Sequence, residues 1–150
     1  MNYLHSMIRV SNLEETLKLF CGVLGFREVR RHESEKGRFT LVFLSASGDE
    51  YHSDKKSPVL ELTYNWPDEN GKSEIYTGGR NFGHLAYAVE NIYEVCQKLI
   101  DFGVRINRPP RDGYMAFFRT ADGISVELLQ KGQPLEIKSP WTEMENFGSW

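Results

Sequence analysis

The chain contains an internal repeat, which limits the folds open to it. Residues 5–15, HSMIRVSNLEE, match residues 84–94, HLAYAVENIYE, and His84 stands 79 positions after His5. Each stretch opens with a histidine, continues as a short apolar strand, and reaches an asparagine followed three positions later by a glutamate. The repeat therefore indicates a fold made from two copies of one structural unit.

A helix is expected to follow each copy of the repeat. The N-x-x-E spacing of Asn12 with Glu15, and of Asn91 with Glu94, resembles a capping box that satisfies free backbone N–H groups. Apolar side chains then recur at helical spacing: Leu13, Leu17, Phe20 and Leu24 in the first helix, and Ile92, Val95, Cys96, Leu99 and Ile100 in the second. Gly25 and Gly103 supply the left-handed residue that commonly ends a helix.

Strand-like segments follow each predicted helix. They cover residues 26–31, 39–46 and 59–65 in the first copy, and 104–107, 114–119 and 125–130 in the second. The prediction is an α+β fold with two tandem βαβββ modules in a single domain, 1–150. Its parts are module 1 (about 1–66), a linker (67–79), module 2 (about 80–131) and a C-terminal tail (132–150), with a charged loop over 48–56.

Composition and charge exclude several classes of protein. The formal net charge is -3 with no basic stripe, which argues against nucleic-acid binding. No apolar run approaches the roughly 20 residues of a membrane helix, and the N-terminal MNYLHSMIRV lacks the pattern of a signal peptide. Cys21 and Cys96 belong to no C-x-x-C pair and are expected to be buried free thiols. The expectation is a cytoplasmic protein with no nucleic-acid or membrane partner.

The tail does not repeat, and it is unusually aromatic for a disordered segment. Trp141, Phe147 and Trp150 lie within the 20 residues after Gln130. We therefore expect the tail to pack against something. The body of the protein, a partner subunit and the mouth of a pocket all remain open.

Two glutamates occupy matching positions inside apolar strands. Leu60-Glu61-Leu62 in the first module corresponds to Val126-Glu127-Leu128 in the second. Because strand side chains alternate, each glutamate lies on the face opposite its apolar neighbours. A glutamate on a solvent-exposed face would show the same pattern, so alternation alone does not indicate a functional role. The recurrence of a histidine and a glutamate in both modules instead favours a shared concave surface with a metal ion, because buried carboxylates need a counter-charge.

The predicted ligands are His5, Glu61, His84 and Glu127. Two imidazoles and two carboxylates suit an octahedral divalent ion such as nickel, zinc, cobalt or manganese, with two positions left for water. Open positions are typical of a catalytic metal rather than a structural one.

These residues resemble the vicinal oxygen chelate superfamily, and within it the glyoxalase I (lactoylglutathione lyase) family. The similar motifs span about residues 3 to 131 and are HSMIRV (5–10), LFCGVLGF (19–26), LELTYNW (60–66), FGHLAYAV (82–89) and DGISVEL (122–128). The chain departs from the family pattern at Thr120-Ala121, where Asp-Pro is usual, and in the tail.

The resemblance implies a homodimer whose metal ligands come from both chains, and one divalent ion per site. It also implies the substrate, the hemithioacetal of glutathione and methylglyoxal, which is isomerised to S-D-lactoylglutathione. Arg9 and Asn65 would hold the glutamyl end of glutathione and Arg80 the glycyl carboxylate, while Arg111 falls near a position that helps to bind glutathione. Arg9 shares a strand face with His5, and Asn65 with Glu61.

The reaction needs a base that moves a proton between two adjacent carbons. Glu127 is assigned as that base by its position in the motif, with Glu61 as ligand and possible second base. Two alternatives remain open: another enzyme of the superfamily (an epimerase, dioxygenase or thiol transferase), and a metal-free small-molecule binding protein. The complete His/Glu/His/Glu set favours glyoxalase I over both.

Overall fold

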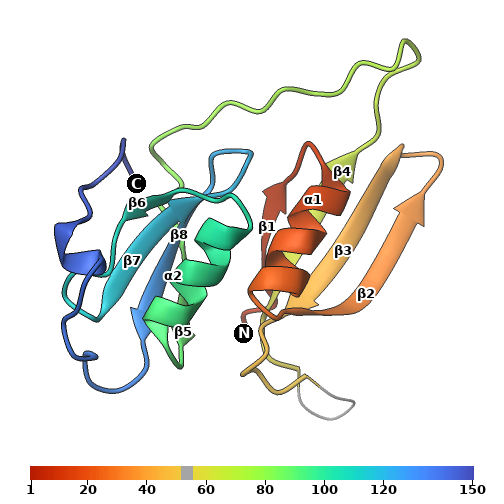
Figure 1. The fold of residues 1–150 in the computed structure, drawn as a ribbon. Coiled ribbons are helices and arrows are strands. Elements are labelled where there is room, and N and C mark those ends of the chain that lie inside the picture. Colours follow the sequence, from red (N-terminus) through yellow and green to blue (C-terminus); the bar gives the residue numbers. More distant parts are fainter. Residues whose placement is uncertain (52–55) are drawn as a thin grey trace. The chain divides into compact units, whose positions relative to one another are not determined.

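The computed structural model describes residues 1–51 and 56–150. The chain divides into two compact units, Met1–Thr77 and Gly78–Trp150, each built on one four-stranded sheet (Figure 1). Residues 52–55 of the predicted charged loop lie outside the described residues. The units have the same succession of elements, which confirms the predicted α+β fold of two βαβββ modules.

Module 1 has the strand order β1-β4-β3-β2. β1 pairs in parallel with β4, whereas β4 with β3 and β3 with β2 are antiparallel. Its elements are β1 (His5–Arg9), α1 (Leu13–Leu17), the π-helix η1 (Lys18–Val23), β2 (Arg27–Ser34), β3 (Phe39–Ser45) and β4 (Val59–Asn65).

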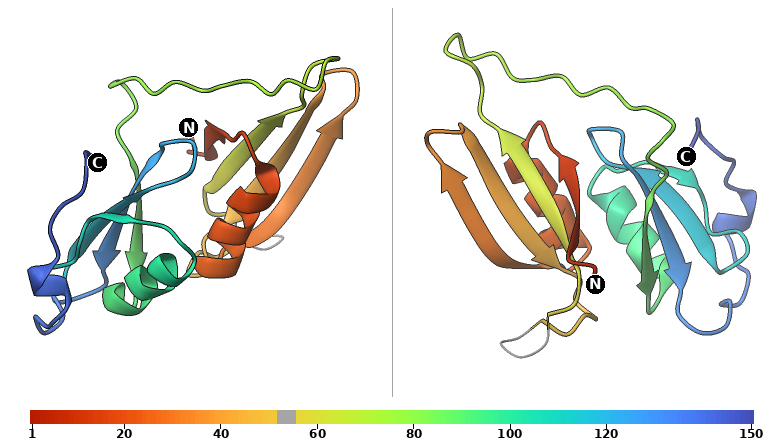
Figure 2. Two further views of the ribbon diagram at one scale, coloured as in Figure 1. Left: turned by 45° about the horizontal axis from the view of Figure 1, so that its top comes forward. Right: turned by 180° about the vertical axis from the view of Figure 1, so that it is seen from behind.

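Module 2 repeats that topology with the order β5-β8-β7-β6 (Figure 2). β5 is parallel to β8, and the other two pairings are antiparallel. Its elements are β5 (Leu85–Val89), α2 (Ile92–Asp101), β6 (Ile106–Arg108), β7 (Met115–Arg119), β8 (Ser125–Gln130) and the short 3-10 helix η2 (Trp141–Glu143) of the tail. In each module the strand that begins at the histidine or directly after it is therefore an edge strand beside the glutamate strand.

The predicted helix starts are confirmed by the cap contacts. The side-chain oxygen of Asn12 accepts from the backbone N–H of Glu15 at 3.1 Å, and that of Asn91 accepts from Tyr93 and Glu94. Glu94 in turn accepts from the Asn91 side-chain amide at 2.8 Å. Gly25 and Gly103 have φ of 76° and 95°, which is the left-handed conformation expected of them.

The first helix differs from its prediction, because after one α-helical turn it widens into the π-helix η1. The backbone N–H of Leu24 bonds to the carbonyl of Leu19, five residues back. The wider turn rotates the following side chains, so Leu19 and Phe20 are buried while Leu24 is only half-buried. Cys21 is also half-buried in η1, which corrects the expectation that both thiols are buried; Cys96 is fully buried.

Each sheet has a core face and an open face. The core face carries fully buried side chains such as Val42 and Leu62 in module 1 and Phe118 and Val126 in module 2. α2 packs against β6, β7 and β8 on that side. Because strand side chains alternate, the histidines and glutamates face the other way. The functional candidates therefore lie on the open face of each sheet.

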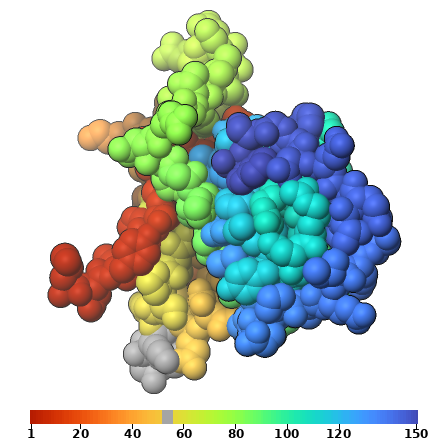
Figure 3. Space-filling model, turned by 90° about the vertical axis from the view of Figure 1, so that its left-hand side faces the viewer, coloured from red at the N-terminus to blue at the C-terminus, as the bar shows by residue number. Residues whose placement is uncertain are grey.

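The aromatic tail packs on module 2. Trp141 is buried, and its ring stacks on Tyr93 of α2 with centroids 5.7 Å apart. In Figure 3 the dark blue tail residues lie against the teal and light blue part of the same module. The tail therefore packs on the body of its own chain, which is one of the three places that the sequence left open.

Candidate metal centre

Module 1 holds one histidine–glutamate pair. His5 is the first residue of β1, and its Nε2 lies 3.0 Å from Oε2 of Glu61 in the middle of β4. The Glu61 side chain is only 12% exposed, whereas that of His5 is 41% exposed. A buried carboxylate thus faces an imidazole that solvent or a ligand can reach.

Module 2 holds a second pair with nearly the same geometry. Nε2 of His84, the residue before β5, lies 3.2 Å from Oε2 of Glu127 in β8. The exposed fractions of the side chains are 42% for His84 and 15% for Glu127. The repeat seen in the sequence is therefore a repeat of side-chain geometry as well.

A phenylalanine completes each pair, and the sequence analysis missed both of these residues. Phe43 is the strand partner of Glu61, and Phe117 is the strand partner of Glu127. The ring of Phe43 meets His5 edge to face with centroids 6.0 Å apart, and that of Phe117 meets His84 in the same way at 5.4 Å. Each module thus carries a His–Glu–Phe cluster on its open face, in which the ring helps to fix the imidazole.

The strand next to each phenylalanine carries an arginine in the equivalent register. Arg30 of β2 pairs with Phe43, and Arg108 of β6 pairs with Phe117. The guanidinium of Arg30 lies over the Phe43 ring, 3.7 Å from its centroid. Arg108 instead contacts Asp112 and the carbonyl of Met115.

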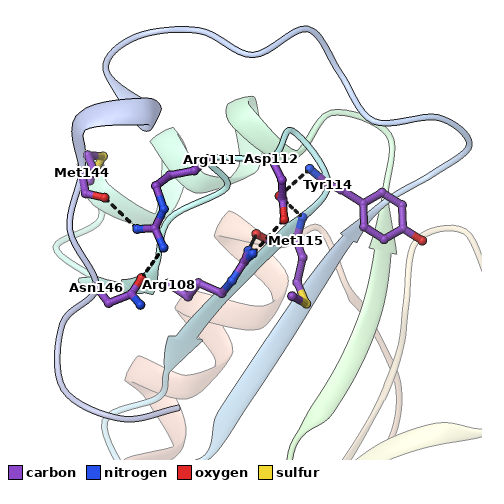
Figure 4. A network of polar contacts seen from close by, with 7 residues as sticks. All are labelled: Arg108, Arg111, Asp112, Tyr114, Met115, Met144 and Asn146. Atoms are coloured by element: carbon purple, nitrogen blue, oxygen red, sulfur yellow. Dashed lines mark hydrogen bonds and ion pairs between the residues drawn. The ribbon is translucent and has the colours of Figure 1, made fainter.

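Arg108 belongs to a polar network at the β6–β7 connection (Figure 4). Its Nη2 lies 2.7 Å from Oδ2 of Asp112, and its Nη1 donates to the carbonyl of Met115. Oδ1 of Asp112 accepts from the backbone N–H groups of Tyr114 and Met115, both at 3.0 Å. Partial burial raises the pKa of Asp112, but the hydrogen bonds from Arg108 and from the two backbone groups outweigh it and hold the pKa below its ordinary value.

The donor set fits a divalent metal ion. In each module one imidazole nitrogen and one carboxylate are already within 3.0 to 3.2 Å of each other, so one ion could bind both. Among residues 1–51 and 56–150, no cluster of three or more His, Cys, Asp and Glu side chains lies together. One module by itself therefore offers a pair of ligands, which is half of the predicted set of four.

The four predicted substrate-binding residues have different surroundings. Arg9 is exposed on the His5 face of β1. Nδ2 of Asn65 donates to Oε2 of Glu74 at 3.0 Å, and Arg80 is exposed in the segment before β5. Arg111 donates to the Met144 carbonyl and to Oδ1 of Asn146, both at 2.8 Å, so the tail occupies its guanidinium.

The chain belongs to the Glyoxalase/Bleomycin resistance protein/Dioxygenase superfamily, whose family model matches residues 2–128. This match covers both His–Glu pairs. The structure also agrees with it, because the two four-stranded sheets have the duplicated βαβββ layout on which the superfamily resemblance was based. In the described residues, no helix has the length and apolar character needed to cross a membrane.

Individual relatives indicate which class of enzyme within the superfamily this chain is similar to. A lactoylglutathione lyase from Neisseria meningitidis serogroup A is 38% identical over 87% of this chain and 91% of its own. A probable lactoylglutathione lyase from Synechocystis sp. is 36% identical over 85% and 93%. The solved structure of a trypanothione-dependent glyoxalase I from Leishmania major aligns with a TM-score of 0.74 at 33% identity, covering 87% of each chain. The predicted enzyme class, the lactoylglutathione lyase type, is confirmed by these similarities.

Proposed function

We propose that this protein isomerises the hemithioacetal of glutathione and methylglyoxal to S-D-lactoylglutathione. The observation that carries the proposal is the duplicated His–Glu–Phe cluster, one on the open face of each sheet. Its relatives named lactoylglutathione lyase support the reaction class.

One divalent metal ion would be held by His5, Glu61, His84 and Glu127. The nitrogen and oxygen donors suit nickel or zinc, and also cobalt or manganese. When bound, such an ion acts as a Lewis acid that disperses the negative charge developing on the substrate oxygens. Two donors would leave most positions of an octahedral ion unfilled, which is why we expect both pairs to contribute.

The protein's own part is the proton transfer. A carboxylate removes the proton from C1 of the hemithioacetal and returns it to C2, while the hydroxyl proton on C1 passes to the oxygen on C2. The 2-oxo hemithioacetal thereby becomes a 2-hydroxy thioester with no net gain or loss of atoms. We assign this role to Glu127, with Glu61 as ligand and possible second base. Both side chains are mostly buried, so few water molecules can protonate the enediolate at random.

We assign substrate binding to three arginines and one asparagine. Arg9 and Asn65 would hold the glutamyl end of glutathione, and Arg80 the glycyl carboxylate, through charge-assisted hydrogen bonds. Arg111 keeps this role only if the substrate displaces its contacts with Met144 and Asn146. The expected location is the cytoplasm, where glutathione is abundant as a reduced thiol.

An activity assay on the metal-free and reconstituted protein tests the proposal. Chelated protein should be inactive toward methylglyoxal plus glutathione, and nickel or zinc should restore thioester formation. The same assay with trypanothione in place of glutathione tests whether this protein prefers the thiol used by the Leishmania relative. An epimerase or another superfamily enzyme would form no thioester with any metal. A metal-free binding protein would also fail to bind the ion.

We further propose a homodimer in which each metal site takes one pair from each chain. Mixing His5→Ala with His84→Ala protein tests this arrangement. If pairs come from different chains, a mixed dimer has one intact site, so free exchange of subunits should restore about a quarter of wild-type activity. If each site forms within one chain, every site in the mixture is damaged and no activity returns.

A further inference from the structure

The two His–Glu–Phe clusters are covered by side chains of different chemistry. In module 1 the Phe43 ring is covered by the cationic Arg30. In module 2 the ring of Trp150 lies against Phe117, tilted by 36° with centroids 6.3 Å apart. Phe117 therefore contacts both the His84 imidazole and the Trp150 indole. The two clusters therefore have the same candidate ligands, but a different side chain contacts the phenylalanine of each: Arg30 in module 1 and Trp150 in module 2.

The tail brings Trp150 to this face through a series of hydrogen bonds. The backbone N–H of Phe147 donates to the Asn107 carbonyl at 2.8 Å, and Nδ2 of Asn107 donates to the Phe147 carbonyl at 2.9 Å. The Phe147 ring also lies under the guanidinium of Arg105, at 3.2 Å from its centroid. Upstream, Arg111 holds Met144 and Asn146 (Figure 4). These contacts fix the course of the tail beside β6.

A residue of β7 binds the end of the tail. Nε of Arg119 donates to the Ser149 carbonyl at 2.8 Å. Arg119 is two positions after Phe117 in β7, so both side chains lie on the face that carries Glu127. Ser149 and Trp150 consequently lie over the open face of module 2.

The equivalent arginine binds other groups in this module. Arg108 has the register of Arg30 but is engaged by Asp112 and the Met115 carbonyl. In the part of the chain that the structure describes, the guanidinium of Arg30 contacts Phe43, whereas the indole of Trp150 contacts Phe117.

We propose that Trp150 is a specificity-determining residue of the site, which with Phe117 forms an aromatic surface for the apolar group of the substrate. This inference rests on the proposed function. Glutathione is charged at both ends, so the apolar part of the hemithioacetal is the group contributed by the 2-oxoaldehyde. Trp150 is still 41% exposed, which leaves indole surface for a ligand to cover. Adducts of aldehydes with larger apolar groups should therefore gain the most affinity from this surface.

Binding of S-substituted glutathiones tests the inference without catalysis. S-methylglutathione and S-benzylglutathione differ only in the apolar group, and their affinities can be measured by calorimetry on nickel-loaded protein. In the wild type the benzyl compound should bind more tightly. Trp150→Ala should lose roughly tenfold in affinity for the benzyl compound and little for the methyl compound, because an aromatic contact is removed.

Two further variants separate a direct role from a loss of order. Trp150→Phe should keep most of the benzyl preference, since an aromatic ring remains. Ile137→Ala removes another exposed apolar side chain of the tail, and it should leave both affinities unchanged. The kcat/KM for the phenylglyoxal adduct should fall in Trp150→Ala far more than that for the methylglyoxal adduct.

An equal change for both glutathiones in Trp150→Ala, or no change for either, would overturn the assignment. A loss in Ile137→Ala as large as that in Trp150→Ala would overturn it too. These outcomes differ from failure of the proposed function. In that case the metal-loaded wild type would form no thioester from either aldehyde.

Discussion

Phe117 stands opposite Glu127 in the pairing of β7 with β8, and its ring meets the His84 imidazole edge to face at 5.4 Å. One aromatic ring thus contacts the histidine and neighbours the carboxylate. Phe43 has the same relation to Glu61 and His5. Hydrophobic neighbours of metal ligands restrict ligand rotation and water access, so the two rings should influence how well the ligands bind a metal ion.

Replacing these rings should weaken metal binding. Phe117→Leu or Phe43→Leu removes the edge-to-face contact while keeping apolar volume, so we expect nickel affinity to fall roughly three- to tenfold. Competition with a chelator measures this affinity. Phe39→Leu is the matched control, because Phe39 packs near His32, which is not a predicted ligand. Unchanged affinity in both cluster variants would show that the rings do not help to position the histidines.

Glu127→Gln should separate metal binding from catalysis. The amide can still occupy the ligand position but cannot accept the proton, so kcat should fall by roughly a hundredfold or more. Metal content after dialysis should stay close to that of the wild type. Glu61→Gln is the matched variant and reports on the second base. Turnover near the wild-type level in Glu127→Gln would show that Glu127 is not the main base.

Arg9→Ala should act on substrate binding. The guanidinium is exposed on the same strand face as His5, where it can pair with a carboxylate of the adduct. We expect KM to rise roughly tenfold or more with a smaller change in kcat, since a charge-assisted hydrogen bond is worth about 1.5–3 kcal/mol. Initial-rate kinetics with the glutathione adduct measure both constants. An unchanged KM would argue that another group or another thiol is used.

Asp112→Asn should lower stability in a pH-dependent way. The asparagine keeps an oxygen for the N–H groups of Tyr114 and Met115 but loses the charge that faces Arg108. The Asp112 side chain is 44% exposed, so solvent screening limits the expected loss to about 1 kcal/mol at neutral pH.

The sign follows from the lowered pKa of Asp112. Its stabilising effect is present above the ordinary value of 3.8 and is lost as the pH falls through the lower folded-state pKa. Urea unfolding should show the full difference between wild type and variant at pH 7. The difference should shrink as the pH falls below about 4. A difference that grows on acidification would contradict the lowered pKa of Asp112.

The two cysteines should differ in reactivity. Cys96 is fully buried, and burial raises the pKa of its thiol to about 12. Burial, with a contribution from Glu28, also raises the pKa of Cys21, but this residue is half-buried and more accessible. A thiol reagent at pH 8 should therefore label Cys21 first, and Cys96 only after unfolding. Mass spectrometry of the labelled peptides distinguishes the two; rapid labelling of Cys96 would show that its surroundings open readily.

The sequence by itself determined the repeat, and with it most of the fold. Cap asparagines and helix-ending glycines are local signals, so the starts and ends of the helical segments could be read from Asn12, Asn91, Gly25 and Gly103. Alternating apolar residues indicated the strands in the same way. The two His–Glu pairs were also predictable, because the repeat places each residue type at matching points of both modules.

Tertiary structure alone decided which side chains surround those pairs. Phe43 and Phe117 are 18 and 10 residues from their glutamates, and only strand register brings them opposite. The tail gave no periodic signal, so its course depended on contacts with Arg111, Asn107 and Arg119. Such contacts join residues distant in sequence, and their geometry depends on the packed sheet. For that reason the different covers of the two clusters, Arg30 and Trp150, could be seen only in the folded chain.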